Sequence, residues 1–233
     1  MKISVLKSKW KTWIKSFIPQ KVADGIVLGF FSVLSMRGLG KSLVAAHRLA
    51  NDSVLSQKNA LGLMNGYIEN QAELGDFLYG KKRTADYNSC EVIALYNCLL
   101  SMKESDLNFA ALLEYFEKKG ITYKGEFGTS PKAIQNYLTK LGYQTELAIG
   151  KRLNYELLTR FQNQYDSYFL TIYNHERDIT KQIHTVSITR EKGKYKLHNA
   201  GTKLEFESLH SIMNFLKVRH SKTLCLCGIS RKG

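Results

Sequence analysis

The sequence contains little proline and cysteine, which excludes several classes of protein. Two prolines in 233 residues argue against a long disordered linker. The four cysteines form neither a disulfide framework nor the CxxC or His/Cys spacing of a zinc site. Cys225 and Cys227 alternate within a strand-like run, so we expect both in a core. We predict no metal and no cofactor, and a compartment without need for disulfides.

Long apolar runs are also missing. The most apolar segment covers residues 22–36, but its core, Ile26 to Met36, has only 11 residues, against the roughly 20 that a spanning helix needs. The preceding 21 residues are too long for an ordinary signal-peptide n-region, and no clear cleavage site follows. We interpret the segment as a buried or membrane-skimming helix. A cytoplasmic or membrane-associated location is favoured, with export by an unconventional signal as the alternative.

Acidic residues are absent from the first 21 positions, which carry six lysines. The whole chain has a formal net charge of +14 and a pI near 9.5, which suits nucleic acid, an anionic membrane or an acidic partner. From Leu6 to Phe17, apolar residues including Trp10 and Trp13 recur at helical spacing. This pattern predicts a cationic amphipathic helix that lies on an anionic membrane or packs on the protein. Since no nucleic-acid motif accompanies the charge, we expect no nucleic-acid partner.

The order of predicted elements indicates an α+β fold. Residues 1–80 read as an α-helical extension, a polar stretch marks a boundary, and residues 81–233 form the main domain. There, helices come first and antiparallel strands later, with a two-stranded hairpin turn at residues 190–194 that uses Gly193. The expected helices are Cys90–Met102, Leu107–Lys119, Pro131–Leu141, Asn154–Gln162 and Glu207–Lys217, and the expected strands are Ser167–Tyr173, Gln182–Thr189, Lys194–Asn199 and Thr223–Ile229.

Cys90 begins one of these helices. The residues just before it, Asp86, Asn88 and Ser89, are good N-cap types. A helix start presents unpaired N–H groups and the positive end of the dipole, which stabilise a thiolate. The same N–H groups can donate to an oxyanion formed on a carbonyl under attack. Cys90 is therefore a candidate nucleophile, with a buried core thiol as the alternative.

A nucleophile needs a base and a group that orients the base. In the predicted strand at residues 182–189, His184 shares a face with Val186 and Ile188, the apolar face that we expect to rest on the helices. The hairpin brings the end of the next strand back beside it. There the side-chain oxygen of Asn199 can accept an imidazole N–H and fix the tautomer. His198 alternates to the opposite face and is the weaker partner.

Taken together, these residues resemble the papain-like cysteine peptidases. The shared pattern is a cysteine that begins a helix, a helix-and-turn element in "GTSPKAIQNYLTKLGYQTE", a strand histidine, and an Asn at the end of the next strand. It covers roughly Arg83 to Ile229 and is most similar to the bacterial branch of bacteriocin-leader-processing (double-glycine) peptidases. The resemblance implies a helical subdomain packed on an antiparallel sheet. It also implies amide hydrolysis of a peptide or protein substrate through Cys90, His184 and Asn199.

Two positions depart from the family's pattern and keep other functions open. The family has a glutamine six residues before the cysteine as an oxyanion-hole donor, where this chain has Thr84; Asn88 is the candidate substitute. Glycine usually follows the cysteine, where this chain has Glu91, whose charge opposes thiolate formation. The alternatives are an acyltransferase or amidase on the same fold, and a non-catalytic papain-like binding module. For residues 1–80, three roles stay open: a membrane anchor, a segment that packs on the protein, and a propeptide that covers the cleft.

Overall fold

The structure, a computed structural model, describes residues 20–35, 37–173, 183–201 and 204–232. Within them, six strands form an antiparallel sheet in the order β1-β6-β2-β3-β4-β5. The strands are Gln144–Ile149 (β1), Ser167–Tyr173 (β2), Ile183–Glu191 (β3), Lys194–His198 (β4), Glu205–Phe206 (β5) and Lys222–Ser230 (β6). The helices and the antiparallel sheet confirm the α+β class.

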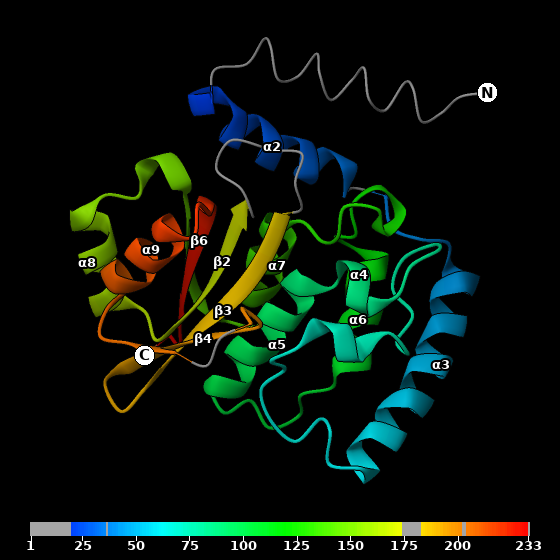
Figure 1. Cartoon of the computed structure of the whole chain (residues 1–233). Coiled ribbons are helices and arrows are strands. Elements are labelled where there is room, and N and C mark those ends of the chain that lie inside the picture. Colours follow the sequence, from blue (N-terminus) through cyan, green and yellow to red (C-terminus); the bar gives the residue numbers. More distant parts are fainter. Residues whose placement is uncertain (1–19, 36, 174–182, 202–203, 233) are drawn as a thin grey trace.

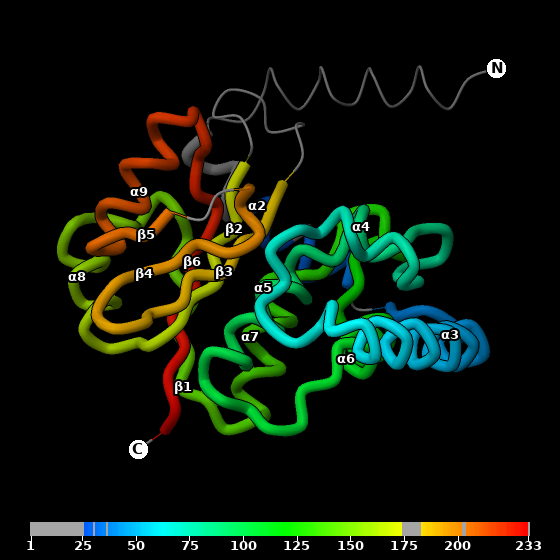
Figure 2. Tube along the Cα trace, turned by 60° about the horizontal axis from the view of Figure 1, so that its bottom comes forward, coloured from blue at the N-terminus to red at the C-terminus, as the bar shows by residue number. Residues whose placement is uncertain are grey.

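Helices cover both faces of this sheet (Figure 1). The α-helices are Gln20–Leu34 (α2), Lys41–Ala60 (α3), Ala85–Asn88 (α4), Cys90–Ser101 (α5), Phe109–Lys118 (α6), Pro131–Lys140 (α7), Tyr155–Gln164 (α8) and Leu209–Val218 (α9), and short 3₁₀ turns are Gln71–Leu74 (η1), Tyr123–Gly125 (η2) and Gly150–Arg152 (η3). Figure 2 shows α8 and α9 on one side of the sheet, with α3, α5, α6 and α7 on the other. The expected helical subdomain on an antiparallel sheet is therefore present, with two further helices behind the sheet.

Strand alternation divides the core into two layers. On β2, Phe169 joins the cluster that contains α5, α6 and α7, while Leu170 joins the cluster with α8 and α9. On β3, Val186 and Ile188 also pack on the α8 and α9 side. The apolar face of β3 thus rests on helices as expected, but these are not the helix that begins with Cys90.

Helix α5 packs against the opposite face of β3, which carries hydroxyl side chains. Thr185, Ser187 and Thr189 are all fully buried there. The hydroxyls of Thr171 and Thr185 hydrogen-bond each other at 3.0 Å, and that of Thr189 pairs with His198. A hydroxyl can be buried at little cost when it has such a partner, so both faces of the strand are internal.

The predicted elements of residues 90–230 are present, most with ends shifted by one or two residues. Gln182, the predicted first residue of its strand, lies outside the described residues. The hairpin between β3 and β4 turns at Lys192 and Gly193, whose φ angles are 50° and 83°, as a type I′ turn requires. Cys225 and Cys227 are buried as expected. Helix α4, strands β1 and β5 and the three 3₁₀ turns were not predicted.

Residues 37–80 form part of the main core. Helix α3 packs on α6. The Arg48–Glu114 ion pair at 2.8 Å and the His47–Glu117 hydrogen bond at 2.7 Å join the two helices. The boundary expected between residues 80 and 81 runs through a hydrophobic core cluster that also contains residues of α5. Residues 37–80 contribute five side chains to this cluster: Met64, Ile68, Leu74, Phe77 and Tyr79.

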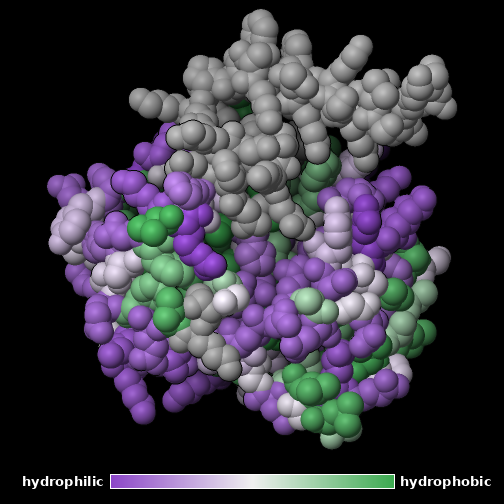
Figure 3. All heavy atoms as spheres, viewed as in Figure 1, coloured by the Kyte–Doolittle hydropathy of each residue, from purple (hydrophilic) through white to green (hydrophobic). Residues whose placement is uncertain are grey.

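Helix α2 lies across the ends of β2 and β3 (Figure 1). Its Phe31 is buried against Tyr173 and Leu224, with Ile183 at the edge of the same cluster. Among the described residues, no helix is both long and apolar enough to cross a bilayer. The tryptophan-containing helix predicted at residues 6–17 lies outside the described residues. Most of the described surface on the face drawn in Figure 3 is hydrophilic, and apolar side chains gather there in separate small groups.

Candidate functional site

Cys90 is the first residue of α5 and sits at its N-terminus, where the sequence predicted it. The short helix α4 ends at Asn88, and the Ser89 hydroxyl donates to the carbonyl of Ala85 at 2.6 Å, which stabilises the step between the two helices. The apolar residues that follow anchor α5 in the core. Only 7% of Cys90 is exposed, so its thiol lies at the inner end of the site.

The Cys90 thiol has two polar neighbours with opposite effects. It donates a hydrogen bond to Oε2 of Glu91 at 3.3 Å. Burial raises the pKa of Cys90 well above its ordinary value, and the Glu91 charge raises it further; the main-chain N–H of Thr185, on β3, partly offsets this rise. The thiol is therefore protonated in this closed arrangement.

Glu91 is a buried carboxyl group, 4% exposed. Its Oε2 accepts the main-chain N–H of Thr129 at 3.3 Å, and a Cβ at Gly128 would lie 2.9 Å from the same atom. The glycine leaves room for the carboxyl, and its φ of +71° also favours glycine. Burial raises the pKa of Glu91 to about 7. Glu91 therefore changes charge near neutral pH, directly beside the thiol.

His184 lies at the start of β3, and its ring is held by Asn199. The Nε2–H group donates to the main-chain carbonyl oxygen of Asn199 at 2.7 Å. The side-chain oxygen of Asn199 instead accepts the N–H of Gln71 at 3.1 Å. Burial lowers the pKa of His184, and the Asn199 carbonyl partly offsets this effect. The ring is thus neutral, with its proton on Nε2 and a lone pair on Nδ1.

The main chain of His184 lies near the Cys90 thiol, although strand alternation puts this residue on the face of β3 that packs on α8 and α9, together with Val186 and Ile188. The Thr185 N–H lowers the pKa of the Cys90 thiol. This N–H belongs to the peptide bond between His184 and Thr185, so the main chain of His184 lies next to the sulfur. Asn199 contacts the His184 ring directly. Within the described part of the chain, no hydrogen bond joins the Cys90 thiol to the His184 ring: the thiol donates to Glu91, and Nε2 of His184 donates to Asn199.

Asn88 lies two residues before Cys90, but its amide N–H groups already have partners. Its Nδ2 donates to the carbonyls of Tyr79 and Gly125, so both N–H groups have partners. Its Oδ1 is buried without a partner among the described residues, and an oxygen cannot donate to an oxyanion. Thr84 donates through its hydroxyl to Asp86. The main-chain N–H groups at the start of α5 are the other donors near the thiol.

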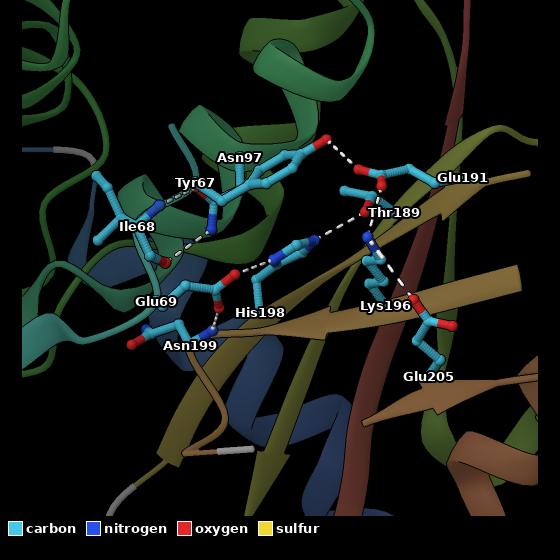
Figure 4. Close-up of polar contacts among 10 residues, drawn as sticks. All are labelled: Tyr67, Ile68, Glu69, Asn97, Thr189, Glu191, Lys196, His198, Asn199 and Glu205. Carbon is cyan, nitrogen blue, oxygen red and sulfur yellow. Dashed lines mark hydrogen bonds and ion pairs between the residues drawn. The ribbon is translucent and has the colours of Figure 1, made fainter. Parts of the chain in front are cut away.

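A further group of polar residues adjoins Asn199, and no sequence pattern pointed to it. Glu69 accepts from Nδ1 of His198 and from the main-chain N–H of Asn199 (Figure 4). Gln71 donates through Nε2 to the carbonyls of Ala85 and Asp86 at 3.2 and 2.9 Å. Both lie about 130 residues before Asn199. No spacing rule joins residues so far apart, so only the fold could reveal them.

The described residues contain no group of three or more His, Cys, Asp or Glu side chains placed to hold a metal ion. Cys90, His184 and Glu91 supply a thiol, an imidazole and a carboxyl group close to the N-terminus of α5.

Comparison with known proteins finds distant similarities among solved structures. No family model matches the chain, and no curated protein matches it. Among solved structures, the peptidase domain of Streptococcus ComA, a bi-functional ABC transporter involved in a quorum sensing pathway, is 11% identical, with a TM-score of 0.40 over 62% of this chain and 93% of that one. The Pseudomonas avirulence protein AvrPphB is 14% identical, with a TM-score of 0.29 over 60% of this chain and 90% of that one. Both TM-scores are too low to support a functional argument.

Proposed function

We propose that this protein is a papain-like thiol peptidase that cleaves an amide bond of a peptide or protein through Cys90, His184 and Asn199. The observation that supports it most is the state of His184. The Asn199 carbonyl accepts its Nε2–H, so the lone pair that can take a proton is on Nδ1. The peptide bond that leads from this residue to Thr185 lies at the Cys90 sulfur.

The reaction begins with transfer of the thiol proton to Nδ1 of His184, which requires the ring to reach the sulfur from the face of β3 that it shares with Val186 and Ile188. The sulfur then attacks the carbonyl carbon of the substrate, and the carbonyl oxygen becomes an oxyanion. His184 returns its proton to the leaving amine as the carbon–nitrogen bond breaks, which leaves a thioester on Cys90. Water, activated by the same imidazole, attacks the thioester, and the acid product and free thiol are formed.

The oxyanion is stabilised by main-chain N–H groups at the start of α5, which point along the positive end of the helix dipole. Asn88 is a poor donor because both of its N–H groups are already donated to carbonyls. Instead it stabilises the loops that carry these carbonyls, next to the helix start.

A non-catalytic binding module is the second candidate, and the environment of Cys90 favours it. The thiol is buried, and the neighbouring carboxyl raises its pKa. If this arrangement is permanent, the thiol never ionises. The peptidase function requires that substrate binding or loop movement change the environment of the thiol. Below a pH of about 7, Glu91 loses its charge and no longer opposes ionisation of Cys90.

The test is incubation of the full chain with a mixture of peptides in heavy-oxygen water, with the Cys90→Ala variant as control. New C-termini that carry heavy oxygen, seen with wild type and absent with the variant, identify a hydrolase. Products joined to an added amine identify an acyltransferase or amidase instead. If wild type and Cys90→Ala yield the same peptides, the proposal fails and the binding module is favoured.

A further inference from the structure

A chain of hydrogen bonds leads from Glu69 to the group that orients His184. The carboxylate of Glu69 receives two N–H groups at the end of β4: Nδ1–H of His198 at 2.6 Å and the main-chain N–H of Asn199 at 3.3 Å (Figure 4). The carbonyl of the same Asn199 accepts Nε2–H of His184 at 2.7 Å. Glu69 therefore anchors Asn199 through its main-chain N–H, and the carbonyl of Asn199 holds the His184 ring.

The His198 ring is itself fixed, so it can serve as a rigid support for the carboxylate. It is 3% exposed. Its Nε2 pairs with the hydroxyl of Thr189 at 2.7 Å, and the Tyr67 ring stacks on it with 4.2 Å between centroids. The carboxylate accepts Nδ1–H, and the Thr189 hydroxyl pairs with the other ring nitrogen, so both nitrogens of the ring have a partner. Glu69 is thus held in one position by a buried partner, although its own side chain is 43% exposed.

The segment that carries Glu69 is also attached to the helix of the thiol. Asn97, fully buried on α5, accepts the N–H of Ile68 at 2.8 Å and donates to its carbonyl at 3.0 Å. Gln71, two residues beyond Glu69, donates its N–H to the Asn199 side chain at 3.1 Å. Residues 67–71 therefore connect α5, which begins with Cys90, to the end of β4.

The other charged groups near His198 pair with one another. The Tyr67 hydroxyl donates to Glu191 at 2.9 Å. Glu191 also pairs with Lys196 at 2.7 Å, and Lys196 lies 3.8 Å from Glu205. These ion pairs occupy the side of the network away from Asn199. Glu69 is the acidic group that contacts the Asn199 main chain among the residues the structure describes.

We propose that Glu69 is a positioning residue for His184, acting through His198 and the main chain of Asn199. This inference rests on the proposed function, because it gives Glu69 the task of orienting the catalytic base. A carboxylate suits the task because it offers acceptors only, and both N–H groups require one. The structure has no other contact that fixes the Asn199 N–H among the described residues.

The test substitution is Glu69→Gln, which keeps the size of the side chain. A glutamine has one acceptor oxygen and one NH₂ group, so one of its two N–H partners would face a donor. The matched control is Glu73→Gln in η1, since Glu73 is exposed and its carboxylate accepts only from the Asn70 side chain among the described residues.

Two measurements are made on the full chain of wild type and both variants. The first is the rate at which an epoxysuccinyl probe labels Cys90. The second is the pH titration of the His184 ring by NMR, with its signal assigned as the one lost in His184→Ala. We expect Glu69→Gln to slow labelling by about tenfold, the loss expected for one weakened hydrogen bond to a charged group, and to lower the pKa of His184. Glu73→Gln should change neither.

The outcomes separate this inference from the proposed function. An unchanged His184 titration in Glu69→Gln overturns the inference, even if the variant melts at a lower temperature. A shifted titration together with a wild type that is never labelled supports the positioning role and contradicts the peptidase function. Thermal melting of each variant shows whether the titration is measured on folded protein. A second variant, Glu69→Asp, keeps the charge but is too short to reach both N–H groups. It should lower the pKa of His184 as well.

Discussion

The His184 ring is oriented by the main-chain carbonyl of Asn199, at 2.7 Å, while the side chain of Asn199 holds the N–H of Gln71 at 3.1 Å. The backbone of Asn199 is in the left-handed region, with φ of 57°, and this turn points the carbonyl at the ring. Asparagine tolerates that conformation better than most residues. The third member of the proposed triad therefore acts through its backbone in this arrangement.

Replacement of Asn199 by glycine should be tolerated better than replacement by alanine. Glycine adopts positive φ freely and keeps the carbonyl in place, whereas alanine costs about 1 kcal/mol in the left-handed region. We expect Asn199→Gly to retain most of the Cys90 labelling rate and Asn199→Ala to lose more, as measured with the epoxysuccinyl probe. Equal, large losses in the two variants would mean that the amide side chain orients the ring.

Removal of the Glu91 charge should make the thiol more reactive. The carboxylate accepts the thiol hydrogen bond at 3.3 Å and raises the pKa of Cys90. An amide lacks this charge and can donate to the thiolate, so Glu91→Gln should lower that pKa. Each unit of decrease gives about tenfold more thiolate at a pH below the pKa. The measurement is the alkylation rate of Cys90 by iodoacetamide, resolved by mass spectrometry.

The control for this substitution is Glu156→Gln, in the exposed first turn of α8. It should leave the alkylation rate of Cys90 unchanged. Slower alkylation in Glu91→Gln than in wild type would show that the carboxyl assists ionisation of the thiol instead of opposing it.

Glu91 should also make stability depend on pH. Burial raises its pKa from 4.5 to about 7, so the folded state binds more protons than the unfolded state between these values. The favourable contribution is fully present below the unfolded pKa and is lost as the pH rises through the folded one. The shift from 4.5 to about 7 corresponds to about 3 kcal/mol of unfolding free energy.

Urea unfolding of wild type and Glu91→Gln across this pH range checks the assignment. As the pH rises from 4.5 to 7, the unfolding free energy of wild type should fall relative to that of Glu91→Gln. Since all other titrating groups are common to both proteins, a difference that stays constant with pH would show that Glu91 ionises normally.

Asn88 should matter mainly for stability. Its amide donates to two buried carbonyls, those of Tyr79 and Gly125, and Asn88→Ala would leave both without this donor. We expect a loss of about 2–4 kcal/mol in unfolding free energy, measured by urea unfolding. Asn163→Ala, on the exposed side of α8, is the control and should change stability little.

An oxyanion-hole role for Asn88 predicts a different result. Loss of such a donor lowers the turnover number by about 10²–10³-fold while stability changes little. A folded, equally stable Asn88→Ala protein with greatly reduced turnover would therefore restore Asn88 as the oxyanion donor.

The predicted elements of the sheet and of the helices around it followed from local patterns. Alternating residues at 183–189 and the Lys192–Gly193 turn specify a hairpin because backbone conformation and side-chain period agree there. Strand β1 was missed because its burial pattern shows little alternation. The two-residue strand β5 is too short to show a period, and the four-residue helix α4 is too short to show one turn-to-turn repeat.

The site was only partly accessible to sequence. Cys90 could be placed at a helix start, and His184 beside Asn199, from spacing and alternation alone. Alternation indicated which face of β3 is apolar, but it did not indicate that α5 covers the polar face, where Thr185 and Ser187 are buried. The Glu91 contact with Thr129 and the Glu69 contact with Asn199 depend on how distant segments pack, which no local pattern contains.

The most direct test of the central claim is covalent labelling of Cys90 by the epoxysuccinyl probe in wild type and in His184→Ala, followed by mass spectrometry. Opening of the epoxide needs a thiolate and a proton donor, which the His184 ring supplies in the proposed mechanism. We predict labelling of Cys90 in wild type and its loss in His184→Ala. Absence of labelling in wild type, or equal labelling of the two proteins, would contradict the assignment of Cys90 and His184 as nucleophile and base.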